Sequence, residues 1–327
     1  MSDTAALAHQ TGFKVTINAQ EVDAGKITRL ETCAALNQPS WANITFHDPG
    51  DPSGAASLAD QYEIGKPVKL TAQVRDETEQ VLFDGEITGL EYEVESGTTF
   101  FTVTAHDKLH RLFHANTFKA GKDMKHSDAM SAALQGADMS VTVDATDDTF
   151  EYLPQTWATD GDLVVALAAA NGMVVQTHDG GVKVAKPDFD ASEVATLLYG
   201  QDVLRFRASQ TARNAADKVT VRGWNVKDKE VVVASSPTIE TKGIPSASDP
   251  SKALSSAMDT SANVVGGAAY IQTDSVATAA AKAMADIIGD AGGAAEGLVL
   301  GRPEMRPGVA VKVEGMPAKF CGKYYLS

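Results

Sequence analysis

The sequence predicts an α+β protein that is mainly β, with two β-barrels, a helix-containing domain between them and a helical insertion in the second barrel. Three observations lead to this fold class. Strand-like alternation fills the first third of the chain, helical spacing begins only after it, and short motifs from the first third return at the end. The expected divisions are a flexible N-terminus (1–12), a first barrel (13–112), a connecting domain (113–200) and a second barrel (201–327) with an insertion at about 236–297.

Alternating apolar and polar residues predict several short strands in the first third of the chain, a pattern typical of a small barrel or sandwich. These strands are expected around 13–17, 44–46, 68–70 and 83–87. Ser96-Gly97 predicts the turn of a hairpin between strands at 90–94 and 100–103. The Asp- and Pro-rich residues 47–52 predict a break, because they cannot continue a central strand.

Helical spacing begins after the first barrel. Three helices are predicted: one capped by Ser127-Asp128 and running through Leu134, one led by Thr159-Asp160 and ended by Asn171-Gly172, and an alanine-rich one over 275–288. A hairpin turn is expected at 178–181, and strands follow at 203–206, 218–221 and 231–233. The stretch 237–262 is rich in Ser, Pro and Asp and is predicted to be irregular.

Charge and cysteine usage exclude several classes of protein. The chain has 327 residues and a formal net charge of -15, which repels a phosphate backbone, so nucleic acid is not an expected partner. No apolar run approaches the roughly 18 residues of a membrane-spanning helix, and no secretory signal is seen, so cytosolic synthesis is expected. Cys33 and Cys321 belong to no C-x-x-C pair, and both are predicted to be buried, reduced thiols.

An internal repeat links the two ends of the chain. The pattern G-x-x-V-K-[LV] occurs at 65–70 and again at 308–313, and F-x-G-x-[IY] follows it at 83–87 and at 320–324. Val219–Val221 matches Ile44–Phe46 upstream, so we interpret the pattern as a duplication. The residues that carry it are Gly65, Val68, Leu70, Phe83 and Gly85 in the first copy, and Gly308, Val311, Val313, Phe320 and Gly322 in the second.

The residues of the repeat are predicted to be architectural. The leading glycine of each copy supplies a permissive turn, and the two apolar positions after it point inward while the lysine points outward. In F-x-G-x-[IY], the phenylalanine and the glycine share one face of a strand. The missing side chain of the glycine lets a curved sheet close around the aromatic ring.

Several segments resemble the phage late control D and VgrG family, the baseplate hub proteins of contractile tails and contractile injection systems. Order and spacing carry the resemblance more than any single motif. The similar segments are Val81–Ile87, Val103–Leu112, Tyr152-Leu153-Pro154-Gln155, Thr159-Asp160, Leu163, Leu167-Ala168, Gly172, Asp179-Gly180, Arg302–Gly308 and Phe320–Tyr325.

The resemblance implies a structural protein and not an enzyme. It implies a homotrimer whose two tube-protein-like barrels per chain adapt the hexameric inner tube to the membrane-piercing spike. The implied partners are other copies of the chain, the inner tube ring, the spike or spike tip and other baseplate proteins, with no cofactor and no metal. Such a hub is assembled in the cytoplasm and becomes part of a phage tail, a type VI secretion machine or an extracellular injection particle.

Two features of the family are missing from the sequence. Typical spike proteins continue into an oligonucleotide-binding-type barrel and a β-helical needle. The first copy of the repeat runs through Tyr92 and returns at 100–103, whereas the second copy reaches Ser327 without a returning strand. We therefore expect the native polypeptide to continue past Ser327, first with the missing last strand and then with a spike-bearing region.

The residues alone leave more than one function open. The enzyme templates G-x-S-x-G, G-x-x-x-x-G-K-[ST] and G-x-G-x-x-G are absent. A cell-wall hydrolase with paired carboxylates is disfavoured, because no site is visible. A tube-like or distal-tail adaptor and a carbohydrate-binding β-module are both compatible with a chain made mainly of short strands.

Three clusters of titratable residues are candidates for chemistry. His106, His110 and His114 have the i, i+4, i+8 spacing of a metal site, but Leu109 and Leu112 interleave with them, so we interpret the segment as a packing face. A calcium site is suggested by three acidic residues that lack EF-hand spacing and are interpreted as a solvated turn: Asp144, Asp147 and Asp148. The third cluster forms one face of a strand: Glu91, Glu93 and Glu95. Its carboxylates are predicted to be wet and are candidates to line the channel of the trimer.

Overall fold

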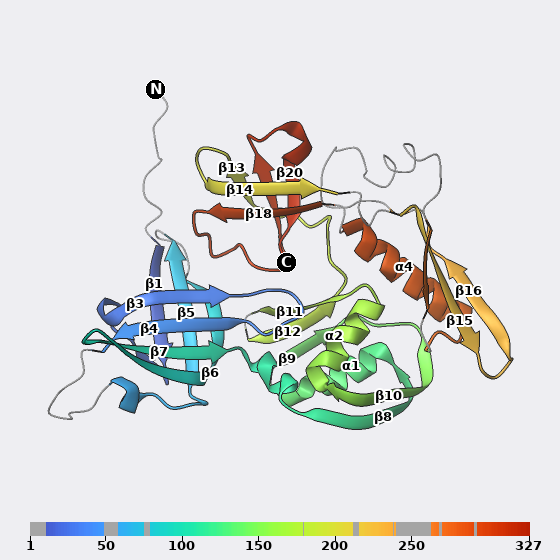
Figure 1. Cartoon of the computed structure of the whole chain (residues 1–327), viewed down its shortest axis with the longest axis horizontal. Coiled ribbons are helices and arrows are strands. Elements are labelled where there is room, and N and C mark those ends of the chain that lie inside the picture. Colours follow the sequence, from blue (N-terminus) through green and yellow to red (C-terminus); the bar gives the residue numbers. More distant parts are fainter. Residues whose placement is uncertain are drawn as a thin grey trace.

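The structure is a computed structural model that describes residues 11–48, 58–74, 79–178, 180–211, 216–237, 239, 263–267, 270–290 and 293–327 (Figure 1). Strands outnumber helices throughout, so the predicted class, α+β and mainly β, is confirmed. Of the helices in the described ranges, none is long and apolar enough to cross a membrane.

The first third of the chain folds into one antiparallel sheet of seven strands, in the order β2-β1-β5-β6-β7-β4-β3. The strands are β1 (Thr11–Ile17), β2 (Gln20–Glu21), β3 (Ile27–Cys33), β4 (Trp41–His47), β5 (Pro67–Val74), β6 (Gln80–Glu95) and β7 (Thr98–His106). The four strands that alternation predicted are confirmed, and the two hairpin strands predicted at 90–94 and 100–103 lie in β6 and β7. Their inward side chains form a buried core that includes Ile44, Phe46, Leu70 and Phe101. The sheet curls as a half-barrel, with β2 and β3 at its two ends.

β6 is twice as long as most of its neighbours and extends past the rest of the sheet. It pairs with β5 only from Gln80 to Glu86, and with β7 from Glu86 to Glu95. Ser96 and Gly97 have φ of 48° and 86°, so the predicted hairpin turn is confirmed. We name residues 88–95 of β6 and 98–104 of β7 the β6–β7 arm. Within the described residues, no strand pairs with the arm on the side of β6 away from β7.

The connecting unit packs two helices against short strands around one buried core. Its elements are η3 (Lys108–Phe113), β8 (Asn116–Lys125), α1 (His126–Leu134), η4 (Gln135–Ala137), β9 (Ser140–Val143), β10 (Thr149–Thr159), α2 (Asp160–Ala170), β11 (Val174–His178) and β12 (Gly181–Ala185). The Thr159 cap is confirmed, because its hydroxyl accepts from the Asp162 N–H at 3.0 Å and the Asp162 carboxylate accepts from the Thr159 N–H at 3.1 Å.

The prediction that Ser127-Asp128 caps the start of α1 is wrong. The helix begins at His126, with Lys125 as its N-cap and no side-chain capping bond. Ser127 lies inside the first turn, and its backbone N–H is satisfied from another element, by the Thr146 hydroxyl at 3.0 Å. A distant hydroxyl therefore replaces the local cap that the sequence pattern suggested.

The described residues of the C-terminal third form three small sheets and the helix α4. The sheets have the orders β13-β19-β20, β14-β18 and β16-β15-β17. The elements are β13 (Glu193–Leu198), β14 (Val203–Gln210), β15 (Lys218–Asn225), β16 (Glu230–Ser235), β17 (Asn263–Gly267), α4 (Asp274–Asp290), β18 (Gly293–Val299), β19 (Ala310–Glu314), η5 (Ala318–Phe320) and β20 (Gly322–Tyr325). The alanine-rich helix and the strands at 203–206, 218–221 and 231–233 are confirmed. A closed second barrel stays a prediction.

Some expectations fall largely outside the described residues. These are the flexible N-terminus, apart from Thr11 and Gly12 in β1, most of the break at 47–52 and most of the irregular stretch 237–262. The cysteine prediction is half right. Cys33 and Cys321 are free thiols, but both are only half-buried, and the Cys321 thiol donates to the Met316 carbonyl at 2.9 Å.

Candidate functional site

β11 is the strand where the first sheet meets the connecting unit. The Asn37 N–H donates to the Val175 carbonyl at 2.8 Å, and the Asn37 side-chain oxygen accepts from the Val175 N–H at 2.9 Å. Two residues after Val175 in β11, the Thr177 hydroxyl lies 3.0 Å from the hydroxyl of Ser40. The loop between β3 and β4 is thus held by alternate residues of one edge strand.

The remaining residues of β11 hold the segment that leads into β19. The Gln176 side-chain amide donates to the Pro307 carbonyl at 2.6 Å, and the Arg306 guanidinium donates to Nδ1 of His178 at 3.1 Å. Arg306 Nε is buried and has no hydrogen-bond partner among the described residues. β11 thus contacts the loop before β4 through Val175 and Thr177, and the segment before β19 through Gln176 and His178.

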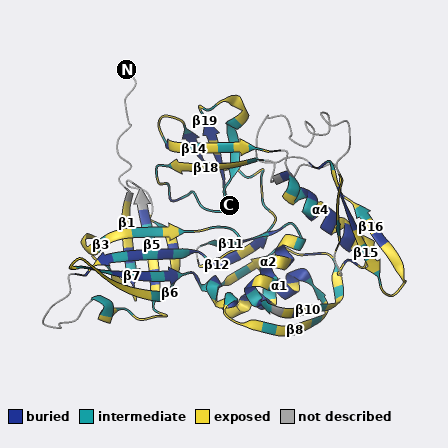
Figure 2. Cartoon of the chain, viewed as in Figure 1, coloured by how far each residue is buried: buried dark blue, intermediate teal, exposed yellow. Residues whose placement is uncertain are grey.

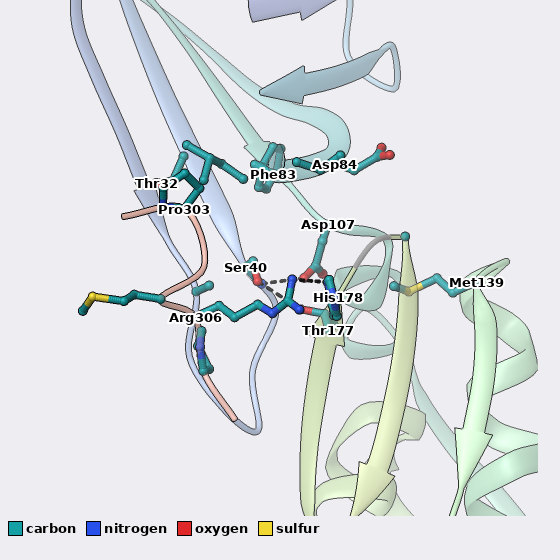
Figure 3. Close-up of a pocket in the computed structure, with 16 residues that line it drawn as sticks. Thr32, Ser40, Phe83, Asp84, Asp107, Met139, Thr177, His178, Pro303 and Arg306 are labelled. Carbon is teal, nitrogen blue, oxygen red and sulfur yellow. Dashed lines mark hydrogen bonds between the residues drawn. The ribbon is translucent and has the colours of Figure 1, made fainter. Parts of the chain in front are cut away.

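A cavity of about 240 Å³ marks this junction (Figure 3). Side chains from the first sheet, the connecting unit and the C-terminal third line it together, among them Phe83, Asp107, Thr177 and Arg306. Within the described residues no cluster of three or more His, Cys, Asp or Glu side chains has the geometry of a metal site. The arrangement is that of a structural joint that sets the relative position of three units.

Asp107 is the buried charge at this joint. Its side chain is 4% exposed, and it accepts from the Ser40 N–H at 2.8 Å and from the Leu109 N–H at 3.1 Å. Burial raises the pKa of the Asp107 carboxyl, and the bonds from Ser40, Thr177 and Leu109 oppose that rise. The carboxylate thus caps η3 and ties it to the loop that contacts β11.

Replacing Asp107 with asparagine is expected to lower the unfolding free energy by about 1–3 kcal/mol at neutral pH, because one backbone N–H loses its acceptor. The folded-state pKa of Asp107 is raised, so its proton adds stability as the pH falls from the folded pKa to the unfolded one. The asparagine variant lacks this gain. The stability difference between wild type and variant is therefore expected to grow on acidification, as measured by urea unfolding at several pH values.

Asp138→Asn is the matched control for Asp107→Asn. Asp138 is exposed and paired with Lys108 at 3.0 Å, and the hydrogen bond from that ammonium lowers its pKa. A lowered pKa gives stability that is lost as the pH falls through it, so the difference between wild type and this variant is expected to shrink on acidification. The same pH trend for both variants would contradict the assignment of Asp107.

The two copies of the repeat share one backbone arrangement. In the first, the Gly65 N–H donates to the Ile87 carbonyl at 2.8 Å, and the Ile87 N–H donates to the Lys66 carbonyl at 2.9 Å. In the second, the same pair of bonds joins Gly308 and Val309 to Leu326, at 2.8 and 2.9 Å. The leading glycines have φ of 85° and 88°, so each supplies the expected left-handed turn. The apolar positions that follow these glycines are all buried: Val68, Leu70, Val311 and Val313.

The second motif of the repeat is two residues out of register. Gly85 pairs with Val68, but the corresponding Val311 pairs with Tyr324, and Gly322 pairs with Val313. Leu326 is therefore the counterpart of Ile87, and the predicted equivalence of F-x-G-x-Y with F-x-G-x-I is wrong. The Tyr324 ring takes the place next to Val311 and packs edge-on against Phe206, with ring centroids 5.8 Å apart.

The phenylalanines and glycines of the second motif have different surroundings in the two copies. Phe83 is 4% exposed in the first core, and a Cβ on Gly85 would lie 2.6 Å from its ring. A side chain at Gly85 would therefore meet the Phe83 ring, and it would also meet the His106 carbonyl of β7. Phe320, in contrast, is a half-buried residue of η5, and Gly322 has a φ of 132°.

The acidic strand face is exposed in the isolated chain. Glu91, Glu93 and Glu95 are all exposed. The apolar residues between them share the core side with Phe101 and Val103 of β7, yet Leu90, Tyr92 and Val94 are 38%, 50% and 66% exposed. In the arm, the face of the sheet that is buried elsewhere is therefore exposed. That the carboxylates line a channel stays a prediction.

The histidine run does not lie on one α-helix. His106 ends β7, His110 lies in η3, and His114 follows it. The ring centroids are 5.9 Å apart for His106 and His110, and 5.1 Å apart for His110 and His114. Leu109 and Leu112 are 2% and 5% exposed, so the interpretation as a packing face is confirmed. Residues 144–148 form an open connection in which Asp144 and Asp147 are exposed.

The joint is not marked by any motif of its own, although Asp107 and Arg306 lie in segments that resemble the hub family. Asn37, Ser40 and Arg306 bond to partners more than 120 positions away in the chain. No local spacing reports such contacts. The nearest signal is the pair Pro307-Gly308, which marks a turn before a repeated strand.

Comparison with solved structures places the fold among phage tail and type VI secretion proteins. The 43 kDa tail protein of prophage MuSo2 from Shewanella oneidensis superposes with a TM-score of 0.70 and 12% identity, covering 96% of this chain and 92% of that one. A tail protein from Neisseria meningitidis MC58 has a TM-score of 0.64 at 12% identity, over 96% and 90% of the two chains.

A third similar structure comes from a secretion system. The E. coli c3393 protein is described as a type VI secretion component similar in structure to T4 tail proteins gp27 and gp5. It has a TM-score of 0.51 at 12% identity, over 95% of this chain and 67% of that one. No curated protein matches the sequence. The family described as "Alg8 N-terminal domain" matches residues 8–327, almost the whole chain, and the protein therefore belongs to this family.

Proposed function

We propose that the chain is the hub of a contractile tail or contractile injection system, a trimer that adapts a hexameric inner tube to a spike. In this proposal residues 13–112 and 201–327 are two tube-like units, joined by the domain at 113–200. The partners are two further copies of the chain, the inner tube ring and the spike with its baseplate neighbours. The role is structural and not enzymatic.

The duplicated hairpin is the observation that carries the proposal. Gly65 and Lys66 bond to Ile87 in the same way as Gly308 and Val309 bond to Leu326, so one pair of backbone bonds occurs in two distant parts of the chain. A chain with two equivalent units offers six of them when three copies close a ring. Such a ring matches the symmetry of a hexameric tube, which gives the duplication a physical reason.

The fold likeness supports the tail role. The tail proteins from Shewanella oneidensis and Neisseria meningitidis match this chain over nine tenths or more of their own length. The c3393 protein, which is described as similar to T4 tail proteins, shares the fold as well. The joint at β11 suits a part that transmits force, because it holds three units by side-chain and backbone bonds from one strand.

The proposal predicts that the purified chain forms a trimer, with a mass three times 34.4 kDa by light scattering or sedimentation. Cyclic closure buries the exposed sheet edges of each copy, which gives the assembly its stability. A hexamer would instead favour a tube-like adaptor, and a chain that is monomeric at all concentrations would overturn the proposal of a hub. Imaging of the native particle with this chain labelled would then place the trimer between the tube and the spike.

A further inference from the structure

We propose that the outer face of the sheet β16-β15-β17 binds the β6–β7 arm of a second copy of this chain. The inference rests on the trimeric hub proposed above and names the two surfaces that meet between its subunits. Each surface has a distinct set of residues, exposure and charge.

One face of the sheet β16-β15-β17 is covered by α4, and among the described residues no element covers the other face. On the covered face, Val219, Val221 and Val232 pack against Ala277 and Ala281 of α4. Strand register then assigns the outer face: Lys218, Thr220, Arg222 and Trp224 in β15, Val231, Val233 and Ser235 in β16, and Asn263, Val265 and Gly267 in β17.

Apolar side chains gather on this outer face. Trp224 and Val231 lie opposite each other on neighbouring strands and are 49% and 62% exposed. Val233 and Val265 are 49% and 59% exposed. Single exposed apolar residues are ordinary, but four on one face of a three-stranded sheet mark an interaction surface.

The charge on the outer face is positive. Of the residues that register assigns to it, Lys218 and Arg222 are the charged ones, and both are exposed. This sign is unusual for a chain with a formal net charge of -15. A surface that is apolar and basic favours a partner that is apolar and acidic, because opposite charges steer the encounter and fix its orientation.

The β6–β7 arm has the complementary properties. Its charged residues are Glu91, Glu93 and Glu95, and all three are exposed. Leu90, Tyr92 and Val94 alternate with them and are also exposed. Since no described strand pairs with the outer edge of this part of β6, an approach along that edge brings both kinds of side chain near the sheet.

The two surfaces lie at opposite ends of the molecule. In Figure 1 the arm of β6 and β7 is at the left end of the longest axis, and β15 and β16 are at the right end, beyond α4. Both regions contain exposed residues in Figure 2. One chain therefore cannot join its own two surfaces, whereas three chains can join them in turn around a threefold axis.

A charge swap tests the proposed contact. Lys218→Glu with Arg222→Glu is expected to raise the dissociation constant of the trimer by at least about tenfold in sedimentation experiments, because it sets like charges against each other. Adding Glu91→Lys, Glu93→Lys and Glu95→Lys to that variant is expected to restore most of the affinity. Lys229→Glu is the matched control, since this exposed lysine lies in the turn between β15 and β16 and not on the outer face.

Cysteine cross-linking provides an independent measurement. In a background with Cys33→Ser and Cys321→Ser, the pair Tyr92→Cys and Val231→Cys is expected to give covalent dimers and trimers on oxidation, and each single variant is not. A trimer that resists the charge reversal and does not cross-link would overturn this inference while the hub survives. A wild-type chain that stays monomeric would overturn both.

Discussion

Replacing Gly85 with alanine is expected to lower the unfolding free energy by at least about 3 kcal/mol, at the upper end of overpacking effects. A Cβ at this position would lie 2.2 Å from the His106 carbonyl oxygen and 2.6 Å from the Phe83 ring. Both distances are too short for non-bonded atoms. Gly85 pairs with Val68 of β5, and the next residue, Glu86, pairs with both β5 and β7, so the backbone cannot move outward without breaking ladder bonds.

Gly89→Ala on the same strand is the control for Gly85→Ala. A Cβ on Gly89 would meet Thr104 at 3.5 Å, an ordinary contact, and the substitution also removes backbone freedom from the unfolded chain. Its effect on unfolding by guanidinium is expected to stay within about 1 kcal/mol. Equal losses for the two variants would show that β6 tolerates no side chain at either position and that close approach at Gly85 is not the cause.

Local signals predicted the elements of this fold well where one short segment decides the outcome. Ser96-Gly97 forms a hairpin turn because both residues adopt positive φ, and Thr159 caps α2 through a reciprocal pair of bonds with Asp162. Each of these structures is complete within a few residues. Alternation predicted the strands of the first sheet for the same reason, because one apolar face per strand is enough to specify burial.

Contacts between distant segments were beyond the reach of such signals. Ser127 has the residue type of a cap, yet Thr146 satisfies its N–H from another element. The motif that begins at Phe320 has the same sequence pattern as the motif that begins at Phe83. The bond from Gly308 to Leu326 nevertheless sets a strand register that is shifted by two residues from that of the first copy. Register depends on which residue lies across the ladder, and a pattern on one strand does not report it.

The joint at β11 shows the same limit at the candidate site. Asn37 and Gln176 lie in segments that carry no motif, and Arg306 lies in a segment that resembles the hub family. Only the fold brings all three together at β11. Asp107 lies in a segment that resembles the hub family, but its role at the joint follows from burial and from two backbone donors.

Replacing Gly308 with alanine is expected to cost about 3 kcal/mol, whereas Gly65→Ala is expected to cost about 1–2 kcal/mol. Both glycines have positive φ, so both variants strain the backbone by a similar amount. They differ in their surroundings. A Cβ on Gly65 meets nothing within 4 Å, but one on Gly308 would lie 2.4 Å from the side-chain oxygen of Gln176.

A double-mutant cycle separates the two contributions at Gly308. Gln176→Ala removes the clash together with the bond from Gln176 to the Pro307 carbonyl, so it is destabilising by itself. The combination of Gln176→Ala with Gly308→Ala is expected to cost less than the sum of the single variants, because residues in contact do not act independently. Strict additivity in urea unfolding would show that Gln176 moves aside freely and that β11 does not hold the second copy of the repeat through this side chain.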